Sequence, residues 1–172
     1  MPAVPLKLRP GSVVRVIAPS QSLAIIGSEV RAEADRKLAA LGLKVSFGEH
    51  VSDCDDFSSS SVQARLADLH AAFADPGVDG ILSVIGGFNS NQLLTGIDYG
   101  LVAAHPKVLC GFSDITVLSN ALYARAGLVG YSGPALFQLR DETALRVHGG
   151  RIPGLPDGRR AGRAGTGPAV ER

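Results

Sequence analysis

The sequence alternates short apolar runs with longer segments of helical periodicity, and this alternation constrains the fold more than any other feature. The apolar runs are rich in β-branched residues or are bounded by Gly and Pro, which favours strands. They cover residues 13–18, 43–47, 78–85, 107–110 and 128–131. Strands that alternate with helices pair in parallel. We therefore predict an α/β fold with an open, mostly parallel sheet and helices on both faces.

Three helices are predicted between these strands. The first covers residues 28–41, with Ser28 as the expected N-cap and Gly42 as the stop. The second covers residues 62–75 and the third covers residues 115–126. In each segment apolar residues recur every three or four positions, which indicates one buried face.

The composition narrows the classes of partner. The formal net charge is +1 and aromatic residues make up 5% of the chain, with no Trp. A balanced charge and few stacking platforms argue against binding of nucleic acid or of a membrane surface. The first residues carry prolines and charges where a signal peptide would be apolar. Cys54 and Cys110 are far apart in the sequence and form no CxxC pair. We therefore expect a cytoplasmic protein with reduced thiols.

The character of the chain changes after about Phe137. From residue 149 to residue 172, fifteen of twenty-four residues are Gly, Pro or Arg. Such a segment buries too little apolar surface to offset its ordering entropy. We therefore expect one folded domain over residues 1–137 and a disordered tail over residues 138–172.

Two loops follow predicted strands directly, at the sheet edge where open α/β folds bind ligands. One is Gly86-Gly87-Phe88-Asn89-Ser90, and the other is Gly111-Phe112-Ser113-Asp114. A serine at a sharp strand-to-helix turn projects its hydroxyl outward, and the helix that follows favours negative charge there. The amide of Asp114 would form half of an oxyanion hole, and Gly87 would supply the other half.

The same residues also fit a plainer interpretation. A strand followed by Gly-x-Ser-Asp and a helix is how an ordinary helix is capped, with Ser113 or Asp114 accepting backbone hydrogen bonds. The G-x-S-x-G pattern is only half met, because Ile115 stands at its second glycine. The glycine loop lacks the spacing of either common phosphate-binding motif.

Taken together, the two loops resemble the LD-carboxypeptidase family. The stretch IGGFNSNQLLTGIDYGLVAAHPKVLCGFSDITVLSNALY, from Ile85 to Tyr123, carries the resemblance. The opening L-x-RPG-x-VVRVIAPS and the later GLVGYSGP are also similar to that family. The GGFNSN form of the glycine loop looks most like the branch that contains the microcin C self-immunity peptidases.

The resemblance implies a serine carboxypeptidase that acts through a Ser-His-Glu triad, with no metal and no organic cofactor. Ser113 would be the nucleophile, and the amides of Asp114 and Gly87 would form the oxyanion hole. The rest of the glycine loop would contact substrate; its residues are Gly86, Phe88, Asn89 and Ser90. The substrate would be a muropeptide tetrapeptide or a peptide-nucleotide antibiotic, and the protein would be a homodimer.

In that family the glutamate and histidine come from a second domain, which we expect to be missing from this chain. A serine without a base is a poor nucleophile, so we expect a truncated, weakly active or inactive peptidase. Glu142 and His148 have nothing to position them as substitutes. The acidic loop around His50 and Asp53 is more typical of a solvated surface than of a metal site. The alternative is a non-catalytic fragment that binds a peptide carboxylate.

Overall fold

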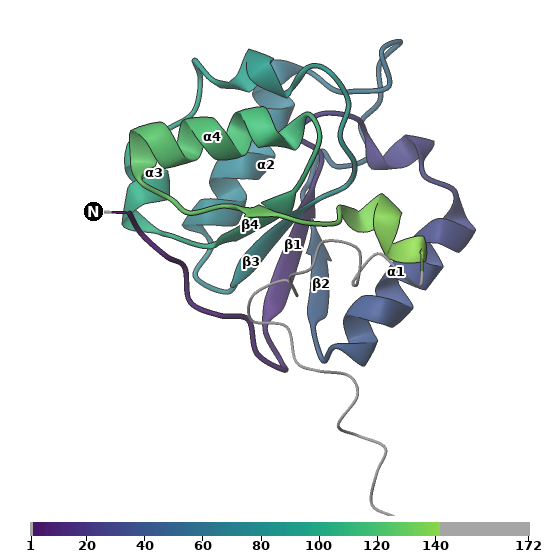
Figure 1. Ribbon diagram of the computed structural model, residues 1–172. Helices are drawn as coiled ribbons and strands as arrows, with labels where there is room; N and C mark the ends of the chain where they lie inside the picture. The colour runs from purple at the N-terminus through teal and green to yellow at the C-terminus, as the bar shows by residue number, and fades with distance from the viewer. Residues whose placement is uncertain (1, 142–172) are drawn as a thin grey trace, which may run out of the picture.

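The computed structural model describes residues 2–141, which form a five-stranded parallel sheet with the strand order β2-β1-β3-β4-β5 (Figure 1). The predicted α/β fold with an open parallel sheet is therefore confirmed. The strands are β1 (Val13–Ile17), β2 (Lys44–Phe47), β3 (Gly80–Ser83), β4 (Val108–Gly111) and β5 (Tyr131–Ser132).

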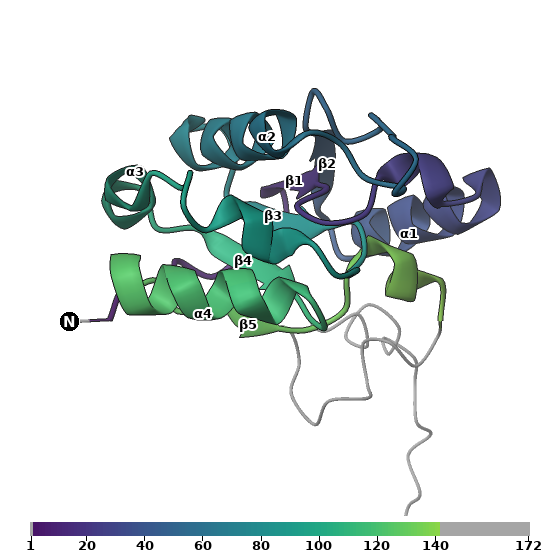
Figure 2. The same cartoon turned by 90° about the horizontal axis from the view of Figure 1, so that it is seen from above.

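Helices cover both faces of the sheet, as predicted. Figure 2 shows α2, α3 and α4 on one face, with α1 and the 3-10 helix η3 on the other. The helices are α1 (Ser28–Ala40), α2 (Val62–Ala74), α3 (Tyr99–Ala104) and α4 (Ile115–Ala126), and the 3-10 helices are η1 (Leu23–Ile25), η2 (Ser90–Leu93) and η3 (Leu136–Arg140). Each face has its own apolar core, because successive side chains of a buried strand point to opposite sides.

The helix ends follow simple chemical signals. The Ser61 hydroxyl accepts a hydrogen bond from the Ala64 amide and so caps α2, which ends just before Pro76. Gly42 has a φ of 76° and follows the last turn of α1. The prediction that Ser28 caps α1 is wrong: Gly27 is the N-cap, and Ser28 is the first helical residue.

The last strand differs from its prediction over residues 128–131. Only Tyr131 lies in β5, while Leu128 forms an isolated parallel bridge with Ala3 near the start of the chain. The amide of Ala3 donates to the carbonyl of Gly127, so the N-terminal segment occupies the pairing positions that precede β5. Helix α3 was not predicted, because its six residues are too short to show helical periodicity.

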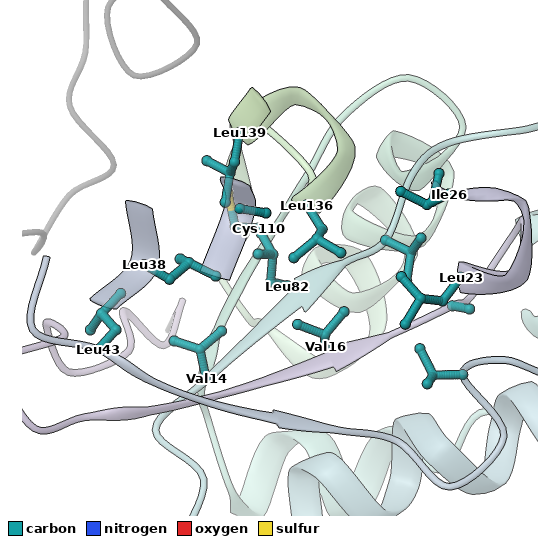
Figure 3. Packing of buried hydrophobic residues seen from close by; sticks show 14 of the residues in the cluster. Val14, Val16, Leu23, Ile26, Leu38, Leu43, Leu82, Cys110, Leu136 and Leu139 are labelled. Atoms are coloured by element: carbon teal, nitrogen blue, oxygen red, sulfur yellow. The ribbon is translucent and has the colours of Figure 1, made fainter. Parts of the chain in front are cut away.

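The packed core continues past Phe137, where the sequence suggested that the fold ends. Leu136 and Leu139 are each 1% exposed and lie against the α1 side of the sheet (Figure 3). The η3 turn therefore closes the core over α1. The predicted tail lies outside the described residues from 142 onward. No helix in residues 2–141 is long and apolar enough to cross a membrane.

The burial of Leu139 leads to a stability prediction. Leu139→Ala should lower the free energy of unfolding by about 2–4 kcal/mol, because it removes a buried side chain and leaves a cavity under η3. Leu6→Ala is the matched control, because Leu6 is 90% exposed, and it should change stability by less than about 0.5 kcal/mol. Urea denaturation measures both variants. Equal midpoints would show that η3 does not belong to the fold.

Candidate functional site

The carboxyl ends of β1, β3 and β4 meet at one edge of the sheet. The chain leaves β1 toward β2 on one side and later places β3 on the other side, so the strand order reverses between β1 and β3. Ligands of open α/β sheets bind at this type of switch point. The loops here begin at Pro19, at Gly86 and at Phe112, and both predicted glycine loops are among them.

Ser113 occupies a bend between β4 and α4. Its φ is 61°, a left-handed conformation that costs a serine about 1–3 kcal/mol. The side chain is exposed, and its hydroxyl makes no hydrogen bond within residues 2–141. A strained, outward-facing serine between a strand and a helix is the geometry of a nucleophile elbow.

Asp114 holds the surrounding loops together. One carboxylate oxygen, Oδ2, accepts hydrogen bonds from the Ser20 hydroxyl at 2.7 Å and from the amides of Asn89 at 3.0 Å and Ser90 at 2.9 Å. The Ser90 hydroxyl donates to the Asp114 carbonyl at 2.8 Å. The side chain makes no capping bond to α4. The simple helix-cap interpretation of Asp114 is therefore wrong, since its carboxylate joins three loops instead.

These contacts shift the acidity of Asp114. Burial raises the pKa of the carboxyl group, but the hydrogen bonds from Ser20, Ser90 and Asn89 more than offset that effect. The pKa therefore lies below its ordinary value of 3.8. The group is a carboxylate at neutral pH, which its three donors require.

The glycine loop packs closely against the elbow. A Cβ on Gly86 would lie 3.1 Å from Ser113 Cβ and 3.3 Å from Ser113 Oγ, so a side chain there would press on the serine. Gly87 faces Ser20, and a Cβ there would overlap the Ser20 hydroxyl. The amide hydrogens of Gly87 and Asp114 have no acceptor within the described chain. Both donors are therefore free to bind a ligand, and their role as an oxyanion hole stays a prediction.

The rest of the predicted loop divides into exposed and buried members. Phe88 is 66% exposed, whereas Asn89 and Ser90 are buried and bind Asp114. Ser20 was not among the predicted site residues, but it is fully buried and its hydroxyl lies 2.8 Å from the side-chain oxygen of Asn89. The position of Ser20, two residues after a predicted strand and at the same sheet edge as the other two loops, could have indicated this role.

The histidines of the described chain are engaged away from Ser113. The His50 ring lies 2.9 Å from Asp53, and His70 accepts a hydrogen bond from the amide of Asp98. His105 ends α3 just before β4, at the opposite edge of the sheet. Residues 2–141 hold no cluster of three or more acidic, histidine or cysteine residues placed for a metal ion. Glu142 and His148 lie outside the described residues.

An open parallel sheet with a serine at a strand-to-helix bend, flanked by free amides, is the arrangement of the α/β class of serine hydrolases. The model of the LD-carboxypeptidase N-terminal domain matches residues 14–133. The chain belongs to this family.

Relatives and solved structures agree with this assignment. The chain is 51% identical over 128 residues to the putative carboxypeptidase YocD of Bacillus subtilis, covering 74% of this chain and 39% of YocD. It is 38% identical over 122 residues to the murein tetrapeptide carboxypeptidase of Pseudomonas aeruginosa, covering 70% of this chain and 38% of that protein. The crystal structure of an MccF-like protein from Bacillus anthracis superposes with a TM-score of 0.79 at 48% identity, over 80% of this chain and 42% of that one. The chain thus spans about two fifths of the length of these relatives.

The Asp114 contacts predict a pH-dependent loss of stability. A carboxyl group whose pKa is lowered by folding stabilises the protein above its unfolded pKa, and this contribution is lost as the pH falls through the folded pKa. Asp114→Asn should therefore lower the free energy of unfolding by about 1–2 kcal/mol at pH 7, and the difference from wild type should shrink below about pH 4.

Denaturation curves between pH 3 and pH 7 measure this difference. Asp35→Asn is the control, because Asp35 is exposed on α1 and makes no hydrogen bond among the described side chains. A difference between wild type and Asp114→Asn that stays constant with pH would contradict the argument.

Proposed function

We propose that this chain carries the nucleophile and the oxyanion-binding half of a serine carboxypeptidase of the LD-carboxypeptidase family. The observation that supports this most strongly is the geometry of Ser113, an exposed serine with a φ of 61° beside Gly86 and the free amide of Asp114. The positive φ alone does not distinguish Ser113, because Ser58 in a surface loop has a φ of 60°. What distinguishes Ser113 is its place at the carboxyl end of β4, beside Gly86 and at the start of α4.

The chemistry follows from these groups. Ser113 Oγ attacks the scissile carbonyl, and the amides of Asp114 and Gly87 stabilise the negative charge on its oxygen. The start of α4 adds the positive end of a helix dipole. The serine proton passes to a base, which then protonates the leaving amine. Water hydrolyses the acyl-enzyme in the second half of the reaction.

The base has to come from outside the described residues. The three histidines of residues 2–141 contact other groups or lie at the far edge of the sheet. We propose that a histidine and a glutamate are supplied by the part of the family fold that this chain does not span. Without them Ser113 is a poor nucleophile, and the chain alone has little or no activity.

The proposed substrate is a short peptide with a free carboxyl terminus, cut at its last peptide bond. The names of two relatives, a murein tetrapeptide carboxypeptidase and an MccF-like protein, support muropeptides and peptide-nucleotide conjugates as the two classes to test. We propose that the enzyme is cytoplasmic, and the family resemblance implies that it uses no metal and no cofactor.

A chimera tests the proposal directly. Residues 1–141 are joined to the part of YocD that follows the corresponding position, and release of the terminal D-alanine from a murein tetrapeptide is measured. The chimera should hydrolyse the peptide, and Ser113→Ala should lower kcat by at least about 10³-fold, because nucleophile loss removes the covalent route.

Ser28→Ala in the same chimera is the control, because Ser28 is an exposed serine on α1. It should leave kcat within about twofold of the parent. A folded chimera that is inactive toward both murein tetrapeptide and a peptidyl-adenylate, or one whose activity survives Ser113→Ala, would refute the assignment.

A further inference from the structure

A pocket of about 350 Å³ opens beside the glycine loop. It lies between the start of α2 and the segment that leads into η2. Its lining includes Asp55, Phe57, Arg65, Phe88, Asn89 and Gln92. The pocket touches the candidate site through Asn89, because its amide binds Asp114 while the same residue lines the pocket.

Arg65 gives this pocket a buried positive charge. The side chain is only 3% exposed, and it lies on the face of α2 that also carries Leu69. Its terminal nitrogens donate to the carbonyls of Pro19 and Asn89 at 3.2 Å and to Gln92 at 2.5 Å. Its Nε has no partner within residues 2–141, and the guanidinium forms no ion pair with a carboxylate of those residues. The carboxylates of Asp55 and Asp114 act on this charge without pairing with it. All hydrogen-bond acceptors of the guanidinium are neutral, so a ligand carboxylate in contact with it would add a charge-assisted bond.

The start of α2 points at the same space. Ser61 and Val62 line the pocket, and the amide of Val62 has no acceptor within the described chain. Because α2 is a 13-residue helix, its N-terminus adds a partial positive charge beside the guanidinium.

Two exposed aromatic rings form the apolar walls. Phe57 is 70% exposed and Phe88 is 66% exposed, although both line the pocket. Phenyl rings left in water at the mouth of a pocket favour an apolar ligand between them. The ligand therefore combines an anion with an apolar group.

We propose that this pocket is a substrate subsite that binds a carboxylate joined to an apolar group of a peptide whose scissile bond lies at Ser113. This inference rests on the proposed function, because Gly87, Phe88 and Asn89 are consecutive and link the pocket to the oxyanion loop. A single carboxylate suits the site better than a phosphate dianion. Arg65 is the one cation of the lining, and Asp55 adds a negative charge at the rim.

Binding is tested on the full chain with Ser113→Ala, so that no turnover occurs. The probes are the blocked dipeptides N-acetyl-Phe-Glu-amide and N-acetyl-Phe-Gln-amide, which differ only in one charge. In NMR titrations the Glu probe should shift the amides of residues 55–65 and 88–92, and it should bind at least about fivefold more tightly than the Gln probe. Equal affinities, or shifts confined to other residues, would overturn the proposal.

Substitutions test separately how the aromatic walls and the charge of the pocket contribute to binding. Phe57→Ala and Phe88→Ala should each weaken the Glu probe by at least about threefold, whereas Phe47→Ala, an exposed ring on β2, should have no effect. Asp55→Asn should tighten the Glu probe but not the Gln probe, since its amide oxygen still accepts the Phe57 amide. Loss of the predicted response in the Phe57 and Phe88 variants together would refute the subsite.

Adenosine monophosphate tests whether the pocket binds a nucleotide instead of a peptide. If it binds at these residues more tightly than the Glu probe, the pocket is a nucleotide site and the peptide assignment fails. The binding experiment and the chimera experiment fail separately. An inactive chimera with a charge-selective pocket would refute only the proposed peptidase activity. An active chimera with an unselective pocket would refute only the proposed subsite.

Discussion

The hydrogen bonds to the carboxylate of Asp114 are the contacts on which the geometry of the site depends. They join the loop after β1, through Ser20, to the loop after β3, through Asn89 and Ser90. Because Asp114 follows Ser113 directly, the same contacts fix the bend that presents the hydroxyl. Arg65 joins the same two loops from the α2 side, because its guanidinium donates to the carbonyls of Pro19 and Asn89.

The topology of the sheet explains why these loops meet. All five strands are parallel, so every strand ends at the same edge. The reversal of strand order between β1 and β3 leaves a gap between their crossover connections, and the loop after β4 closes one side of it. The rigid core beneath, with apolar layers on both faces of the sheet, keeps the three loop ends in place.

Much of this arrangement is predictable from local patterns in the sequence. Apolar periodicity placed three helices and the first four strands, because each buries a regular face. It also placed Gly86 and Ser113 at strand ends. It misplaced the last strand, because pairing between Ala3 and Leu128 is a long-range contact that no local pattern encodes.

Side-chain networks were the least accessible from sequence. The role of Asp114 depends on a rotamer that turns away from its own helix, and nothing local distinguishes this from an ordinary cap. The burial of Arg65 was only weakly indicated by the sequence, where it is a charged residue on the apolar face of α2. Its unpaired Nε and the pocket beside it depend on Pro19 and Gln92, which are distant in sequence.

The left-handed backbone at Ser113 has a consequence for how such a chain changes over time. Glycine adopts this conformation without steric cost, so it would relieve the local strain at that position while leaving the turn intact. A lineage that no longer needed the hydroxyl would gain thermodynamic stability from that single replacement. The proposed role of the Ser113 hydroxyl would explain why a serine stands where glycine would be less strained.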